Sequence, residues 1–120
     1  MIAVIFEVWP AAGRKDDYLT LAASLREDLG RIDGFISVER FQSLTDPNKL
    51  LSLSLWRDEE AVKKWRNLSS HRDSQRLGRA GIFADYRLRI AAVVRDYGMS
   101  DRAEAPDDSR AVHDMQQSSS

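Results

Sequence analysis

Apolar residues fill most of the first nine positions of the chain and then recur with helical spacing. The stretch IAVIFEVW, residues 2–9, is rich in β-forming residues and is followed by Pro10, which predicts a buried strand that ends there. A helix is predicted over residues 15–30, because four large apolar residues recur there at steps of three and four. The four residues, which share one face of this helix, are Tyr18, Leu21, Leu25 and Leu29.

A β-hairpin is predicted next, because two strand-like stretches flank a strong turn signal. Residues 35–44 form its first strand, and TDPN at residues 45–48 forms the turn, in which Pro47 fixes φ. Residues 49–56 form the second strand, since their side chains alternate in steps of two. Three leucines lie on one side of this strand and two serines and a tryptophan on the other: Leu51, Leu53 and Leu55 against Ser52, Ser54 and Trp56.

The remaining pattern predicts a second helix in two parts and a last strand. The first part begins at Arg57 or Asp58, and the second runs from Ser70 to about Ala80. Residues 85–97 then read as a long strand. The resulting order, β-α-β-β-α-β, is that of the ferredoxin-like fold, an α+β fold in which one antiparallel four-stranded sheet carries both helices on one face.

The sheet face away from the helices is predicted to bind a second copy of the chain. We expect the all-apolar sides of the strands to face the helices, namely Ile2, Val4, Phe6 and Val8 together with Leu51, Leu53 and Leu55. The opposite face then mixes apolar and charged residues: Ile5, Trp9, Trp56 and Val93 beside Glu7, Arg87 and Arg89. That mixture favours a homodimer that encloses a barrel-like interior, with Glu7 paired to Arg87 or Arg89. A monomer with a solvated arginine stripe is the alternative.

Composition narrows the possible classes of function. The chain has 120 residues and no cysteine, which excludes thiolate chemistry. Its net charge of -1 argues against nucleic acid or anionic lipid as partners. We assign residues 1–97 to the folded domain. Residues 98–120 hold two basic and five acidic residues and end in serines, which predicts an acidic, flexible tail or, alternatively, an arm on a partner subunit.

Several kinds of site and location are not supported by the sequence. No apolar stretch approaches the about 20 residues that span a membrane, so we expect no membrane association and a cytoplasmic protein. His71 and His113 are far apart, so no metal site is expected. Neither a phosphate-binding loop nor a dinucleotide fingerprint is present, and we expect no cofactor.

Two stretches resemble the antibiotic biosynthesis monooxygenase family. They are LSLWRDEEAVKKWR, with its tryptophan-bearing strand-to-helix junction, and HRDSQRLGRAGIFADYRLRIAAVVRDYG further on. The resemblance covers roughly residues 1–97 and implies a homodimer of ferredoxin-like chains, a dimeric α+β barrel, with a small-molecule cavity between the sheet and the helices. The family includes cofactor-independent monooxygenases of aromatic or quinol-like compounds and haem-degrading enzymes.

The resemblance implies a set of site residues. His71 is the candidate base, and Arg87 and Arg89 are candidates for stabilising an anion. Candidates for contacting an aromatic ligand are Trp56, Trp65, Asn67, Arg72, Phe83 and Tyr86. Each has a purely structural alternative: His71 and the nearby arginines as solvated helix residues, Trp65 as core, and Phe83 with Tyr86 as anchors of a corner.

Three functions follow in order of preference. The first is a cofactor-independent monooxygenase, the second is a non-catalytic barrel that binds a small ligand, and the third is a haem-binding or haem-degrading enzyme. Haem comes last because the first strand lacks the asparagine that haem-degrading relatives place there, and its charged residue is Glu7.

Overall fold

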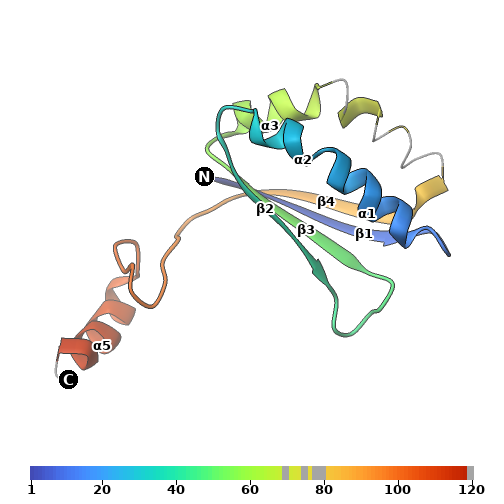
Figure 1. The fold of residues 1–120 in the computed structure, drawn as a ribbon. Helices are drawn as coiled ribbons and strands as arrows, with labels where there is room; N and C mark the ends of the chain where they lie inside the picture. Colours follow the sequence, from blue (N-terminus) through green and yellow to red (C-terminus); the bar gives the residue numbers. More distant parts are fainter. Residues whose placement is uncertain (69–70, 74–75, 77–80, 119–120) are drawn as a thin grey trace.

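The chain folds into one four-stranded antiparallel sheet with helices on a single face, as the computed structural model shows (Figure 1). The structure describes residues 1–68, 71–73, 76 and 81–118. The strands are β1 (Ile2–Pro10), β2 (Phe35–Gln42), β3 (Leu50–Trp56) and β4 (Phe83–Ala92), and they lie in the order β2-β3-β1-β4. The predicted ferredoxin-like arrangement is therefore confirmed.

The predicted first helix is present but is divided into α1 (Lys15–Ser24) and α2 (Arg26–Gly30). Its division has a local cause, because the Ser24 hydroxyl donates a 2.6 Å hydrogen bond to the Leu21 carbonyl and so competes with the helical backbone pattern. The predicted apolar face is confirmed, since Tyr18 and Leu29 are buried against the sheet side. Together with α3 (Glu59–Arg66), the two segments lie in the layer above the sheet (Figure 1).

Helix α3 (Glu59–Arg66) begins where the sequence predicts, with Asp58 as its N-cap. The Asp58 carboxylate accepts a 2.9 Å hydrogen bond from the Ala61 amide, and this bond is the main reason why the pKa of Asp58 is lowered. The second predicted segment, Ser70 to about Ala80, lies largely outside the described residues, although residues 71–73 and 76 are helical.

Strand β4 is shorter than predicted. Residues 85–97 were expected to form it, but it spans Phe83–Ala92. It ends because its partner ends: Ala92 pairs with Ile2, and the last bond of the ladder runs from the Val93 amide to the Met1 carbonyl. Among the described residues, β1 is the strand with which β4 pairs, so its ladder stops where β1 stops.

The two sides of strand β3 are the reverse of the prediction. Val4 pairs with Ser54 and Phe6 with Ser52, so the serines and Trp56 face the helices while Leu51, Leu53 and Leu55 face away. Trp56 is fully buried beneath α3 rather than on the outer side. We call the side away from the helices the outer face; it carries Ile5, Glu7, Leu51, Leu53, Leu55, Arg87 and Arg89.

Glu7 is the centre of charge on the outer face. Its carboxylate lies 2.7 Å from the Arg89 guanidinium and 2.9 Å from the Lys49 ammonium. These partners, led by Lys49, lower the pKa of Glu7. The predicted pairing of Glu7 with Arg89 is thus present within one chain.

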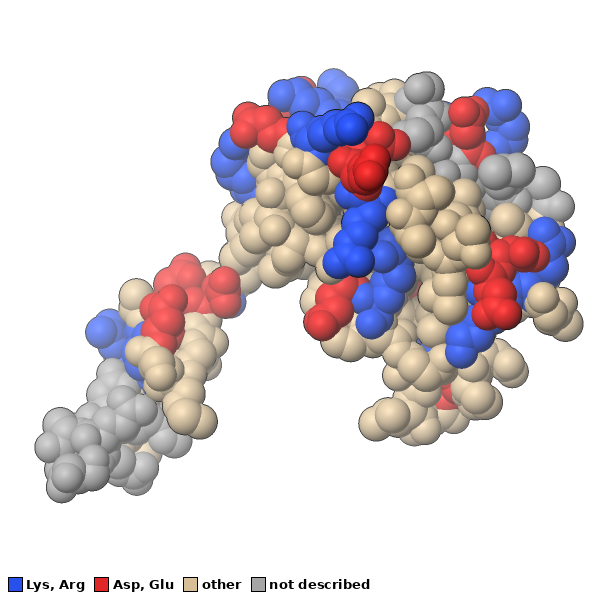
Figure 2. All heavy atoms as spheres, viewed as in Figure 1, with Lys and Arg blue, Asp and Glu red and all other residues tan. Residues whose placement is uncertain are grey.

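A helix, α5 (Asp107–Ser118), occurs in the segment for which the sequence predicts a flexible tail, and Figure 1 shows it extending away from the sheet. The flexibility of residues 98–120 stays a prediction. Among the described helices none is long and apolar enough to cross a membrane. Basic and acidic side chains are interspersed over the described residues of the face shown in Figure 2.

Candidate functional site

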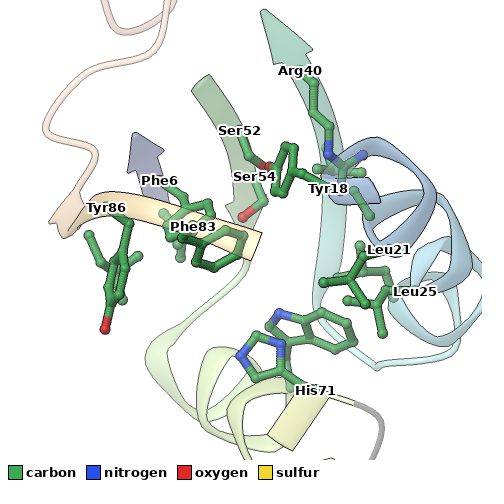
Figure 3. A pocket seen from close by; sticks show the side chains of 16 residues that line it. Phe6, Tyr18, Leu21, Leu25, Arg40, Ser52, Ser54, His71, Phe83 and Tyr86 are labelled. Atoms are coloured by element: carbon green, nitrogen blue, oxygen red, sulfur yellow. The ribbon is translucent and has the colours of Figure 1, made fainter. Parts of the chain in front are cut away.

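A cavity of about 220 Å³ lies between the sheet and the helices (Figure 3). All four strands contribute to it from below, and α1, α2, α3 and His71 close it from above. Most of its wall is apolar, as in Val4, Phe6, Leu21, Leu25, Phe83 and Leu88. This volume suits a small compound with one to three rings and short substituents.

Besides His71, five described residues with a hydroxyl or guanidinium group line this cavity: Tyr18, Arg40, Ser52, Ser54 and Tyr86. The sheet register places Arg40 and the two serines there, because Arg40 pairs with Ser52 and Val38 with Ser54 across β2 and β3. Ser54 is buried, and its hydroxyl accepts a 2.8 Å hydrogen bond from the Trp56 indole. The floor of the cavity is therefore hydroxyl-bearing, while its walls are apolar.

Arg40 and Tyr18 lie together at one side of the cavity (Figure 3). Burial raises the pKa of the Tyr18 phenol, and the neighbouring Arg40 guanidinium offsets part of that rise. The Nε atom of Arg40 is buried and has no hydrogen-bond partner among the described residues. The same residues provide no ion pair for Arg40, so none of their carboxylates neutralises its positive charge.

His71 packs against Trp65, with the two ring centroids 4.6 Å apart. Burial lowers the pKa of His71 to about 4, and the charges of Arg72 and Arg66 add to this effect. The imidazole is therefore neutral at pH 7 and offers both a donor and an acceptor nitrogen. Such a group can hydrogen-bond an enol, a phenol or a carbonyl oxygen in the cavity.

We expect the depressed pKa of His71 to make folding stability depend on pH. The unfolded chain protonates His71 near 6.5, whereas the folded protein does so at about 4, so the unfolded state binds more protons between these values. The stabilising contribution is complete above pH 6.5 and is lost as the pH falls toward 4. Because the ring is partly exposed, we expect it to amount to about 1–2 kcal/mol.

Urea unfolding of the wild type and of His71→Gln at pH 7 and pH 5 checks this expectation. The stability difference between the two proteins should be larger at pH 7 than at pH 5. The carboxylates with lowered pKa, such as Glu7 and Asp58, titrate below this window and cancel in the comparison. An equal difference at both pH values would show that His71 is not held neutral by its surroundings.

The structure brings together four of the residues that the sequence suggested. His71, Trp65, Phe83 and Tyr86 all line the cavity. Phe83 and Tyr86 form an aromatic cluster with Phe6, since the three ring centroids lie 5.6–6.1 Å apart. The aromatic wall predicted from the sequence is therefore present, although what it binds stays a prediction.

The other suggested residues lie elsewhere. Trp56 is core, packed behind Trp65 with ring centroids 6.4 Å apart. Asn67 and Arg72 are exposed and bind each other, through a 2.8 Å hydrogen bond from the guanidinium to the amide oxygen. Arg87 and Arg89 project from the outer face, so the idea that they stabilise an anion beside His71 does not fit their position.

Arg40 and the two serines were not singled out by the sequence reasoning. A signal for Arg40 does exist, because it alternates with Val38 along β2 and so shares the helix-facing side with an apolar residue. For Ser52 and Ser54 the pattern misleads, since serines opposite leucines suggest a solvated face.

The cavity does not fit a haem group. At about 220 Å³ it is smaller than the roughly 300–1,000 Å³ of ordinary ligand pockets, and a porphyrin would have to displace packed side chains. Among the described residues, no cluster of three or more His, Asp or Glu side chains could hold a metal ion.

The chain matches known proteins in sequence. The family model described as antibiotic biosynthesis monooxygenase matches residues 1–77. The protein named Jasmonate monooxygenase ABM from Pyricularia oryzae is 48% identical over 93 residues. The match covers 78% of this chain and 43% of that protein, so the chain spans less than half of the relative's length.

Solved structures share the fold at low sequence identity. Rv0793 from Mycobacterium tuberculosis superimposes with a TM-score of 0.73 at 14% identity, covering 81% of this chain and 98% of that chain. A Deinococcus radiodurans protein that carries the same family description gives 0.74 at 12% identity, with 82% and 97% covered. A conserved protein from Methanosarcina mazei gives 0.68 at 20% identity, with 75% and 89% covered.

Proposed function

Because the chain belongs to the antibiotic biosynthesis monooxygenase family, we propose that it is a monooxygenase whose reaction takes place beside His71 in the cavity. The observation that carries this proposal is a neutral imidazole, packed at a tilt against Trp65, at the wall of a small and mainly apolar space. Such a space excludes most water, which strengthens each polar interaction made inside it. The substrate class that fits is a small ring compound, aromatic or quinol-like or a cyclic ketone.

The reaction that we propose needs no bound cofactor, because the substrate itself supplies the electrons. A methylene group activated by a neighbouring carbonyl loses a proton, and the resulting enolate or phenolate reduces dioxygen. One oxygen atom ends as a new carbonyl on that carbon, and the other leaves as water with the two hydrogens. The methylene carbon loses four electrons and dioxygen gains four, so no outside reductant enters. A hydroquinone has no methylene group; there one ring C–H becomes C–OH and the quinol becomes the quinone, which again releases four electrons and forms one water.

In this scheme His71 hydrogen-bonds the substrate oxygen and takes the proton. Its pKa of about 4 makes it a weak base while the cavity holds no charge. A negative charge that develops beside the ring raises that pKa, because the protonated imidazole then has an anionic neighbour. His71 therefore becomes a stronger base as the enolate forms, which is the step at which the reaction needs a proton acceptor.

The name of the Pyricularia oryzae relative adds one compound to the substrates worth testing. Jasmonate is a cyclopentanone, so it has a methylene group next to a ketone, as the proposed chemistry requires. Since the chain spans 43% of that relative, jasmonate is one candidate beside anthrones and hydroquinones.

Oxygen consumption with a panel of an anthrone, a hydroquinone and jasmonate tests the proposed function. We expect uptake with at least one of them and incorporation of one atom from ¹⁸O₂ into the product. His71→Ala should lower the rate at least about 100-fold, as expected for loss of an acid–base group. Lys63→Ala, on the exposed side of α3, is the matched control and should keep the wild-type rate.

Two outcomes of this experiment contradict the proposal in different ways. Turnover that survives His71→Ala would remove His71 from the mechanism. Ligand binding without oxygen uptake for the whole panel would instead favour a non-catalytic barrel that binds small molecules.

We also propose that two chains associate through their outer faces into a homodimer. None of the described helices covers that side of the sheet, although it carries Ile5, Leu51, Leu53 and Leu55 (Figure 1). Burial against an identical face would remove these side chains from water, while Glu7 with its cationic partners stays paired.

A further inference from the structure

Arg40 is the cationic side chain among the described residues that line the cavity. It lies on the helix-facing side of β2, opposite Ser52, and its Nε is buried without a hydrogen-bond partner among the described residues. A guanidinium carries five N–H donors and no acceptor. A buried donor that lacks an acceptor is energetically unfavourable. A ligand that supplies a hydrogen-bond acceptor to this donor would therefore be stabilised at the site.

The surroundings of Arg40 suit an anion. No aspartate or glutamate is found among the described residues of the cavity wall, and the nearest hydroxyls are those of Tyr18 and Ser52. The rest of the wall is apolar and aromatic. A ligand that satisfies this cavity has an apolar body and one negatively charged end.

Figure 3 places Arg40 and His71 at opposite ends of the cavity. A ligand whose charged group binds Arg40 therefore extends its other end toward His71 and Trp65. Anchoring one end fixes the distance between the anchor and the reacting carbon, which positions that carbon for the reaction.

We propose that Arg40 binds the carboxylate of the substrate, and that this protein selects small apolar carboxylic acids over neutral compounds of the same shape. The inference rests on the proposed function only in placing the substrate in this cavity. A planar guanidinium matches a carboxylate through two parallel hydrogen bonds, and the Tyr18 hydroxyl beside it supplies a further donor.

Calorimetric titration with 1-naphthylacetate and 1-naphthylacetamide tests the inference directly, because the two probes differ in charge but hardly in shape. We expect the acid to bind roughly 10- to 100-fold more tightly than the amide. Arg40→Met should abolish that preference and leave amide binding in place. Arg40→Lys, which keeps the charge but loses the forked geometry, should retain part of it.

Arg31→Met is the matched control, since Arg31 is exposed after α2 and does not line the cavity; its preference for the acid should equal that of the wild type. Equal binding of acid and amide by the wild type would overturn the inference, as would a preference that persists in Arg40→Met. These results leave oxygen uptake unaddressed, so the carboxylate inference and the proposed monooxygenase activity succeed or fail separately.

Discussion

Replacing Trp56 with alanine is expected to lower the free energy of unfolding by about 3–5 kcal/mol. The side chain is fully buried between the sheet and α3, where it contacts Phe35 and Trp65. Its removal leaves a cavity, and it deprives the buried Ser54 hydroxyl of the donor at 2.8 Å. For a domain whose total stability is about 5–15 kcal/mol, this loss is about a fifth or more of the total.

Denaturant unfolding of Trp56→Ala, Trp56→Phe and Trp9→Ala would measure this effect. Trp9 is the matched control, because it is only partly buried at the end of β1 and makes one 3.1 Å hydrogen bond to Asp46. We expect Trp9→Ala to lose about 1–2 kcal/mol, and Trp56→Phe to lie between the two alanine variants. Similar losses for Trp56→Ala and Trp9→Ala would contradict the central role of Trp56 in the core.

The sequence was sufficient to predict the order of the four strands and of the helices between them, because these elements have local signals, whereas α5 was not predicted. Helix α3 is an example, since Asp58 supplies the cap and Glu59 with Glu60 the acidic first turn that mark a helix start. The end of β4 has no such signal. It depends on where β1 begins, which is a pairing between distant parts of the chain.

The sequence could not predict which side of β3 faces the helices, because both sides of this strand carry large apolar side chains. Leucines cover the outer face, and Trp56 occupies the core beside serines that line a cavity. A rule that sends the more apolar side inward assumes that only one side meets protein. That assumption fails for a sheet with an uncovered apolar face, and a slip of one residue then reverses the side of every residue.

The candidate site was predictable in part. His71 and the aromatic residues stand out as residue types that chemistry or a ring-shaped ligand would use. His71, Trp65, Phe83 and Tyr86 do line the cavity, whereas Trp56 lies in the core. The residue type of Arg40 does not distinguish it from the many other arginines of the chain. Its distinction is positional, since it is paired with Ser52 on the helix-facing side, and only the register shows this.

The outer face leads to the second large effect that we expect, in Leu53→Glu. Leu53 pairs with Ile5 at the middle of this face, so a carboxylate there would be buried without a solvated partner in the proposed homodimer. We expect light scattering to give twice the 13.7 kDa chain mass for the wild type and about that mass for Leu53→Glu. The variant should keep its fold, measured by circular dichroism, because the helix-side core does not include Leu53.

Leu19→Glu provides the control for this experiment, as it introduces the same charge at an exposed leucine on α1, away from the outer face. It should remain dimeric. If the wild type scatters as a single chain, the proposed homodimer does not exist. If Leu53→Glu stays dimeric, the chains associate through another surface. Dissociation in Leu53→Glu alone would tie association to the apolar side of the sheet, and it would explain why a strand with leucines on one side turns its serines toward the helices.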